Sequence, residues 1–160
     1  MGQLSYTQRL SNPQRVAHLA WRVAAKNIDI PGFGPNGNTC ATRLSVAFNK
    51  AGAKIIPFGG IETLGTADGS RIIFRVREFR KYILHTLGKP SKDITNPFDS
   101  NFIGKKGVIA FSVTGWSNAS GHIALWDGVQ YREPPYDDYS RYRDERTSAQ
   151  TTQAEFWELI

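Results

Sequence analysis

The sequence contains a single cysteine, Cys40, so no disulfide can form within the chain. It also lacks long apolar runs: no stretch is long enough to span a bilayer, and the residues after Met1 contain no apolar core of a secretion signal. No group of cysteines and histidines has the spacing of zinc ligands, and we expect neither a metal nor another cofactor. These absences exclude a disulfide scaffold. They predict a protein made in the cytoplasm without a signal peptide and without a membrane partner.

The composition is that of one globular domain with a basic surface. The chain has 160 residues, of which 40% are apolar, enough for a core without metal or disulfide support. We therefore expect a single domain over residues 1–160. The net charge of +6 suits a polyanionic partner, but charge alone does not distinguish a nucleic acid from a cell wall that carries free carboxylates.

Cys40 lies where a glycine-rich loop gives way to a predicted amphipathic helix. The helix is indicated by apolar residues on one face at three- and four-residue spacing: Leu44, Ala47, Phe48 and Ala51. Asn38 or Thr39 is the expected N-cap, and Gly52 the expected end. In the first helical turn, free backbone N–H groups and the positive end of the helix dipole favour a thiolate, which makes Cys40 a candidate nucleophile. The alternative is a buried cysteine that fills a gap in the core.

A histidine at the beginning of a predicted strand supplies the base that a cysteine nucleophile needs. His122 opens the segment 122–126 and follows small residues, so its side chain can project into a cleft. The other two histidines, His18 and His85, lie within helical patterns over 15–25 and 76–87. His122 is therefore the candidate general base.

The dipeptide Asp127-Gly128 predicts a two-residue hairpin turn between strands 122–126 and 129–133. A turn of this length places Trp126 opposite Val129 and, further along, His122 opposite Glu133. Directly opposed side chains share one face of the sheet. Glu133 is therefore placed to accept a hydrogen bond from the imidazole of His122.

This register makes Glu133 the candidate third member of a catalytic triad, which fixes the tautomer of the imidazole. The same geometry also fits a plain cross-strand charge pair. A bulge, or an early end of the second strand, would shift the pairing and leave Asp137 or Asp138 in that position. The sequence leaves these alternatives open.

Three motifs together resemble the fourth family of type VI secretion amidase effectors. They are Asn38-Thr39-Cys40-Ala41-Thr42-Arg43-Leu44-Ser45 with Asn49-Lys50-Ala51-Gly52, then Gly121-His122-Ile123-Ala124-Leu125-Trp126-Asp127-Gly128, then Phe156-Trp157-Glu158-Leu159. The resemblance implies a papain-like, NlpC-type cysteine peptidase that cleaves peptidoglycan stem peptides between D-glutamate and meso-diaminopimelate. It assigns Cys40 as nucleophile and His122 as base. The third position is usually aspartate in that family, so Glu133 departs from its pattern.

The resemblance also implies where such a protein acts. Family members leave the producing cell through the type VI secretion machinery and act in the periplasm of a target bacterium. The expected partners are the stem peptide, the secretion machinery and a cognate immunity protein, and no nucleic acid. Two other interpretations stay open: a basic nuclease toxin that uses His122 with Glu133 or Asp137, and a non-catalytic cell-wall-binding module.

Three further residues are candidates for contact with a stem peptide. Arg43 lies one turn from Cys40 and can bind a carboxylate through two hydrogen bonds, or can be an ordinary surface arginine. Asn38 can donate to the oxyanion together with the backbone N–H of Cys40, or can only cap the helix. Trp116 can wall the cleft or only anchor a loop.

The order of the predicted elements indicates an α+β fold with the Cys40 helix packed on an antiparallel sheet. Further helices are expected over Pro13–Ala25 and Val76–Leu87, and strands over Val108–Val113, His122–Trp126 and Val129–Glu133. Thr152-x-x-Glu155 has the form of a capping box, which is typical of the start of a helix. The charged and aromatic run 136–146 is expected to be a solvated loop rather than a platform that stacks nucleic-acid bases.

Overall fold

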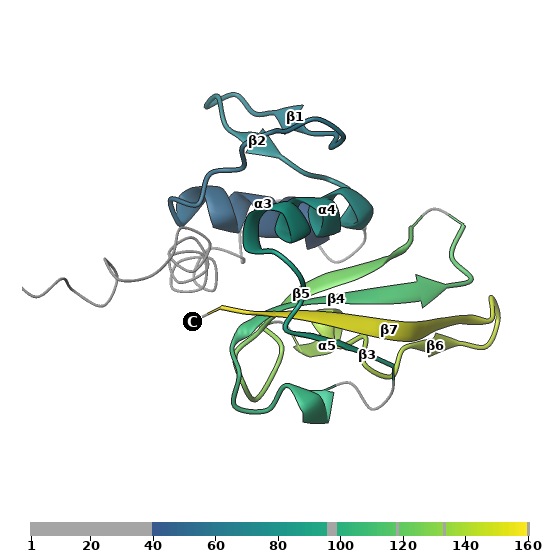
Figure 1. Ribbon diagram of the computed structural model, residues 1–160. Helices are drawn as coiled ribbons and strands as arrows, with labels where there is room; N and C mark the ends of the chain where they lie inside the picture. The colour runs from purple at the N-terminus through teal and green to yellow at the C-terminus, as the bar shows by residue number, and fades with distance from the viewer. Residues whose placement is uncertain (1–39, 96–98, 118, 133, 160) are drawn as a thin grey trace, which may run out of the picture.

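The computed structural model describes residues 40–95, 99–117, 119–132 and 134–159, so the predicted helix Pro13–Ala25 lies outside the described residues. Two helices, α3 and α4, cover one face of an antiparallel sheet, and a short hairpin lies on the far side of the helices (Figure 1). In chain order the elements are α3 Cys40–Lys50, β1 Leu64–Gly65, β2 Arg71–Ile72, α4 Val76–Leu87, β3 Lys92–Ile94, the 3-10 helix η1 Asp99–Asn101, β4 Gly107–Thr114, β5 Gly121–Trp126, α5 Pro134–Asp137, β6 Arg143–Asp144 and β7 Ala149–Glu158. No helix in these ranges has both the length and the apolar character needed to cross a membrane.

The two predicted helices within the described residues are confirmed, and both end at a glycine. At the end of α3, the Ala53 N–H donates to the Phe48 carbonyl oxygen (3.0 Å) and the Gly52 N–H to that of Asn49 (3.1 Å), which is a Schellman motif. Gly52 has φ of 83°, a left-handed conformation that a residue with a side chain rarely adopts. α4 ends differently at Gly88, which has φ of 82° and donates its N–H to the Leu84 carbonyl oxygen (3.1 Å).

The main sheet has the strand order β3-β7-β4-β5, with β6 paired to β7, and every pairing is antiparallel. β5 therefore ends this order as the edge strand. In the β4–β5 pair, Phe111 lies opposite His122. The described architecture is α+β with antiparallel sheets, as the sequence predicts.

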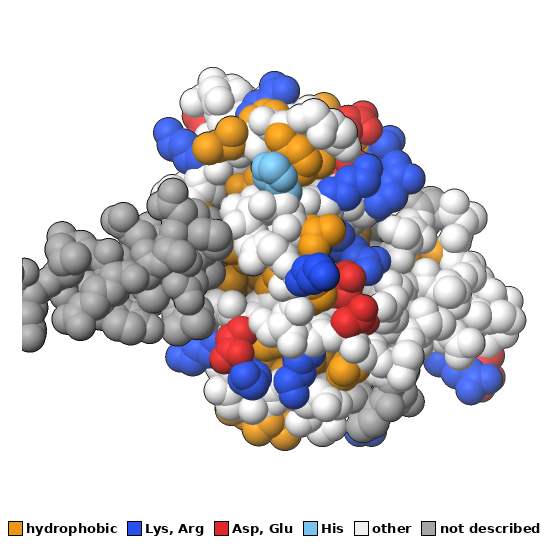
Figure 2. All heavy atoms as spheres, in the orientation of Figure 1, with side chains coloured by type: hydrophobic (Ala, Val, Ile, Leu, Met, Phe, Trp, Pro, Cys, Tyr) orange, Lys and Arg blue, Asp and Glu red, His pale blue; other side chains and the backbone are white. Residues whose placement is uncertain are grey.

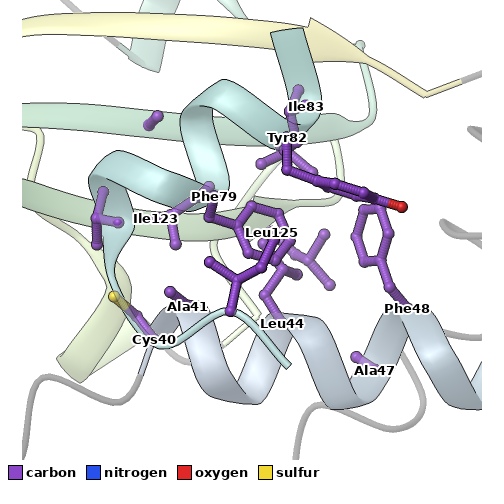
Figure 3. Close-up of a cluster of buried hydrophobic side chains, with 14 of the residues drawn as sticks. Cys40, Ala41, Leu44, Ala47, Phe48, Phe79, Tyr82, Ile83, Ile123 and Leu125 are labelled. Carbon is purple, nitrogen blue, oxygen red and sulfur yellow. The ribbon is translucent and has the colours of Figure 1, made fainter. Parts of the chain in front are cut away.

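Apolar side chains alternate between the two faces of the sheet and form two cores. Ile123 and Leu125 of β5 face α3 and α4, where Phe48 and Phe79 meet edge to face at 5.6 Å (Figure 3). The opposite face carries a second cluster of buried residues: Phe102, Ile109, Phe111, Ala124, Trp126, Tyr131, Ala154 and Phe156. Figure 3 also shows Cys40 at the beginning of α3, beside Ile123, so one end of the helical core adjoins the candidate nucleophile.

The chain turns back after β5, with the Asp127 N–H donating to the Gln130 carbonyl oxygen (3.1 Å) and the Arg132 N–H to that of Leu125 (3.0 Å), but the predicted register is wrong. Trp126 pairs with Tyr131 in an isolated bridge, and Val129 is 81% exposed, so the register that placed Trp126 opposite Val129 does not form. The reason is the side chain of Asp127, whose Oδ1 accepts the N–H groups of Val129 and Gln130 (both 2.8 Å) and stabilises a wider turn. The strand expected over Val129–Glu133 is absent from its described residues, 129–132.

The C-terminal segment is a strand and not the helix that the capping-box pattern predicted. Thr152 and Glu155 both lie within β7, which pairs with β4 on one side and with β3 on the other. Ala154 and Phe156 fill the second core, while Trp157 faces the helices. Pairing on both sides and burial of these apolar side chains outweigh the local capping signal.

Candidate active site

Cys40 is the first residue of α3 and is 8% exposed. Its helix is fixed to the segment that precedes α4 through Ser45. The Ser45 hydroxyl accepts the Ile73 N–H (2.9 Å) and donates to the Ala41 carbonyl oxygen (2.9 Å). The thiol is thus held at a helix N-terminus, where the helix dipole stabilises negative charge.

His122 approaches Cys40 from the edge of the sheet. Alternation along β5 places its side chain with Ala124, on the face opposite to Ile123, and an edge strand leaves the ring open to the beginning of α3. The preceding residue must be glycine, because a Cβ at Gly121 would lie 1.9 Å from the Phe111 carbonyl oxygen. Gly121 therefore sets the close pairing that brings His122 into place.

Asp137 is the carboxylate that meets this histidine. Its Oδ1 lies 3.0 Å from His122 Nε2, and its side chain is 3% exposed. Asp137 is the last residue of the short helix α5. This helix follows β5 after a wide turn, in place of a full second strand. Glu133 lies outside the described residues, and Asp138 is exposed, with its Oδ1 accepting the Ser140 N–H (3.1 Å). The structure thus brings Asp137, an alternative that the sequence left open, to the imidazole.

The surroundings of the imidazole favour its protonated form. Burial, the largest influence, lowers the pKa of His122, but the charges of Cys40 and Asp137 and the hydrogen bonds with both residues raise this pKa to about 9. Since Asp137 occupies Nε2, the ring nitrogen left for the sulfur of Cys40 is Nδ1. At neutral pH the imidazole of His122 is therefore protonated.

An aromatic cluster packs on the outer face of the imidazole. The Tyr139 ring stacks on His122 with centroids 4.2 Å apart and planes 13° from parallel. Trp116 contacts Tyr139 edge to face at 5.7 Å, and its Nε1 donates to Tyr142 Oη at 3.0 Å. The expectation of a solvated loop over 136–146 is therefore wrong for Tyr139 and Tyr142, which are half-buried against the site.

The three predicted substrate contacts have different positions. Trp116 contacts Tyr139, which stacks on His122, and its contact with a substrate stays a prediction. Arg43 is 8% exposed, so it is not an ordinary surface arginine, and its contact with a substrate stays a prediction. Asn38 lies outside the described residues.

The stacking of Tyr139 on His122 is not predicted from the sequence. The signal for it was an aromatic spacing of three residues, Tyr136, Tyr139 and Tyr142, after the histidine strand, but only the fold shows which ring reaches His122. Within the described ranges, no group of three or more His, Cys, Asp or Glu side chains is arranged to hold a metal ion.

Comparison with known proteins gives one family and several solved structures. Residues 36–157 match the family model of the type VI secretion system amidase effector protein 4. No curated protein matches the chain significantly by sequence. The solved structure of the effector Tae4 from Salmonella typhimurium in complex with the immunity protein Tai4 from Enterobacter cloacae matches at 26% identity and a TM-score of 0.72, over 87% of this chain and 98% of that one.

Two further solved structures agree with this match. The Tae4–Tai4 complex from Enterobacter cloacae is 27% identical, with a TM-score of 0.71, over 89% of this chain and 96% of that one. The Tae4 / Tai4 effector–immunity system from Salmonella typhimurium is 29% identical, with a TM-score of 0.65, over 99% of this chain and 100% of that one. The similarity therefore extends over nearly the whole length of the chains compared.

Proposed function

This chain belongs to the type VI secretion system amidase effector protein 4 family, and we propose that it is a cysteine peptidase that hydrolyses the bond between D-glutamate and meso-diaminopimelate in peptidoglycan stem peptides. The observation that carries the proposal is the joint placement of three groups. Cys40 begins a helix, His122 reaches it from the edge strand, and Asp137 holds the far nitrogen of the ring at 3.0 Å. Nucleophile, base and orienting carboxylate are the parts of a cysteine peptidase triad.

In the proposed reaction, the Cys40 thiolate attacks the carbonyl carbon of the γ-D-glutamyl amide. The carbonyl oxygen becomes an oxyanion, and the proposed donor to it is the backbone N–H of Cys40 at the start of α3. The His122 imidazolium gives its proton to the leaving amine of diaminopimelate, and a thioester remains. His122 then takes a proton from water, which attacks the thioester and releases the glutamyl carboxylate and the thiol.

The role of Asp137 in this scheme is to hold the imidazole and keep it charged. Its hydrogen bond and charge raise the pKa of His122, so the proton needed by the leaving amine is present at neutral pH. The arrangement of a helix-start cysteine against an antiparallel sheet also supports a papain-like, NlpC-type fold over a single domain.

The family also suggests the biological setting. We propose that the type VI secretion machinery delivers the protein to the periplasm of a target bacterium, where the stem peptide lies. A cognate immunity protein is the second expected partner, because the similar Tae4 structures include complexes with Tai4.

The location of the substrate gives the first prediction. Wild-type protein directed to the periplasm of a Gram-negative host is expected to lyse the cells, whereas cytoplasmic expression is expected to be tolerated, because peptidoglycan lies outside the inner membrane. Culture turbidity and cell shape are the measurements. Equal toxicity in the cytoplasm would contradict the proposal and favour the nuclease interpretation.

The ring of Tyr139 gives a second prediction. Tyr139→Ala removes the stacked ring and is expected to lower kcat by about two- to tenfold, the effect of an aromatic contact of about 0.5–1.5 kcal/mol. Tyr139→Phe keeps the ring and is expected to stay within about twofold of wild type. Steady-state digestion of a soluble stem peptide measures both. A loss in the phenylalanine variant as large as in the alanine variant would show that the hydroxyl matters, and not the stacking.

A further inference from the structure

A groove of about 560 Å³ is lined in part by Ser120, two residues before His122 in the sequence. One wall is the beginning of α4 and the residue pair before it, and the other is the end of the β4–β5 connection, which leads directly into Gly121 and His122. The lining residues are Phe74, Arg75, Val76, Arg77, Ser117, Ala119 and Ser120. Figure 1 shows the start of α4 and this connection at the same end of the molecule.

The segment that leads into α4 places the groove near the start of α3, where Cys40 lies. The carbonyl oxygen of Arg71 accepts the side-chain N–H of Asn49 (2.7 Å), near the end of α3, and Ile73 binds Ser45 one turn earlier in the helix. The segment thus runs antiparallel to α3, so the residues after Ile73 lie alongside the helix start. Groove and thiol therefore belong to one end of the structure.

Among the residues that the structure describes, the charged side chains lining the groove are those of Arg75 and Arg77. Figure 2 shows Lys and Arg side chains gathered over the beginning of α4. The ion pairs of both arginines leave donors over: Arg75 binds Glu62 through Nη1 (2.7 Å) and Arg77 binds Glu78 through Nε (3.2 Å). A guanidinium has five N–H donors, so each can still bind an anion.

The Glu78 carboxylate is paired with Lys81, so it does not cancel the positive charge of the groove. Glu78 is buried and receives Lys81 Nζ (3.1 Å) and the Glu62 N–H (3.3 Å) in addition to Arg77. Arg77 is 66% exposed in its side chain and is free to orient its outer nitrogens toward the groove. Phe74 and Val76 add an apolar wall for aliphatic carbon. The volume is in the range of about 300–1,000 Å³ that is usual for small-ligand sites.

We propose that this groove binds a free carboxylate next to the scissile bond of the substrate peptide, through Arg75 and Arg77, with the Ser117 and Ser120 hydroxyls as further donors. The proposal rests on the proposed function for the identity of the peptide. It assigns a specificity-determining role to two arginines that the sequence analysis did not single out. The substrate class is an anionic peptide. Neutralising its carboxylate is expected to raise KM and to leave kcat similar.

The test uses soluble stem peptides with free carboxylates and two amidated forms, one at the α-carboxyl of D-glutamate and one at the ε-carboxyl of diaminopimelate. For wild type, one of the amidated peptides is expected to have a KM about tenfold higher than the free form, with a similar kcat, as for a lost charge-assisted contact. The double variant R75Q/R77Q is expected to show this higher KM for the free peptide and no further increase for the amidated one.

Arg71→Gln is the matched control, because Arg71 is exposed and lies near the far end of α3. It is expected to keep the wild-type KM. Melting curves check that R75Q/R77Q folds, and if it does not, the comparison of free and amidated peptides on wild type decides alone. Equal KM values for all three peptides on wild type, or an unchanged KM in a folded double variant, would overturn the carboxylate site.

Calorimetric titration separates this proposal from the proposed function. The free peptide is titrated into Cys40→Ala protein and into the same protein with R75Q/R77Q, so binding is measured without turnover. Weaker binding in the second protein, by about tenfold, supports the groove even if wild type releases no product, which would reject the peptidase. Cleavage by wild type with equal binding to both proteins would reject the groove alone.

Discussion

Replacing Cys40 with alanine is expected to abolish the release of soluble muropeptides from purified sacculi, lowering turnover by roughly 10⁴- to 10⁶-fold, as the loss of a catalytic nucleophile does. The fold should persist, because alanine is apolar and only slightly smaller than the cysteine it replaces at the start of α3. Turbidity of the sacculi measures digestion, and circular dichroism with a melting curve measures folding.

Ala41→Gly is a useful comparison for this variant. Ala41 is the next residue of α3 and is fully buried, so a glycine there perturbs the helix start without touching the thiol. This variant is expected to lose stability but keep activity below its melting temperature. Full digestion by a folded Cys40→Ala protein would end the peptidase proposal.

Removing the carboxylate of Asp137 is expected to have the second largest effect. Asp137→Ala deprives His122 Nε2 of its partner at 3.0 Å and should lower kcat by about 10- to 10⁴-fold, the range for loss of an orienting acid. Asp138→Ala and Glu133→Ala are the matched controls and are expected to stay near wild type. Activity retained in Asp137→Ala but lost in Glu133→Ala would restore the hairpin register that the sequence predicted.

The same variant has a signature in the pH profile. In wild type the imidazolium of His122 is present below its pKa of about 9, so kcat/KM should fall as the pH rises through that value. Asp137 raises this pKa, and its removal therefore moves the alkaline limb to lower pH. A limb that stays at the same pH in Asp137→Ala would show that the aspartate only affects folding.

The parts of the fold that the sequence predicted correctly have local causes. Gly52 and Gly88 stop α3 and α4 where the apolar spacing ends, because each adopts a left-handed φ. Cys40 at the start of its helix follows from the same pattern, and so does His122 at the beginning of its strand. These features depend on a few neighbouring residues, which a single sequence displays.

The parts that it predicted wrongly depend on distant partners. Thr152 and Glu155 form a capping pattern that is typical of a helix start, yet the pairing of β7 with β4 and β3 decides the conformation of this segment. The dipeptide Asp127-Gly128 suggested a tight turn, but the Asp127 side chain binds two backbone N–H groups and widens it. That widening, with α5 after it, is the reason that Asp137 meets His122. The stacking of Tyr139 on that ring depends on the same path of the chain.

Mass spectrometry of the products that wild-type protein releases from sacculi identifies the bond that is cleaved, with Cys40→Ala protein as the blank. We expect fragments that end in a free γ-carboxyl on D-glutamate, together with peptides whose diaminopimelate has a new free amine. We expect neither product in the Cys40→Ala digest. Intact stem peptides after treatment with folded wild-type protein, or products cut in the glycan strand, would rule out the proposed cleavage.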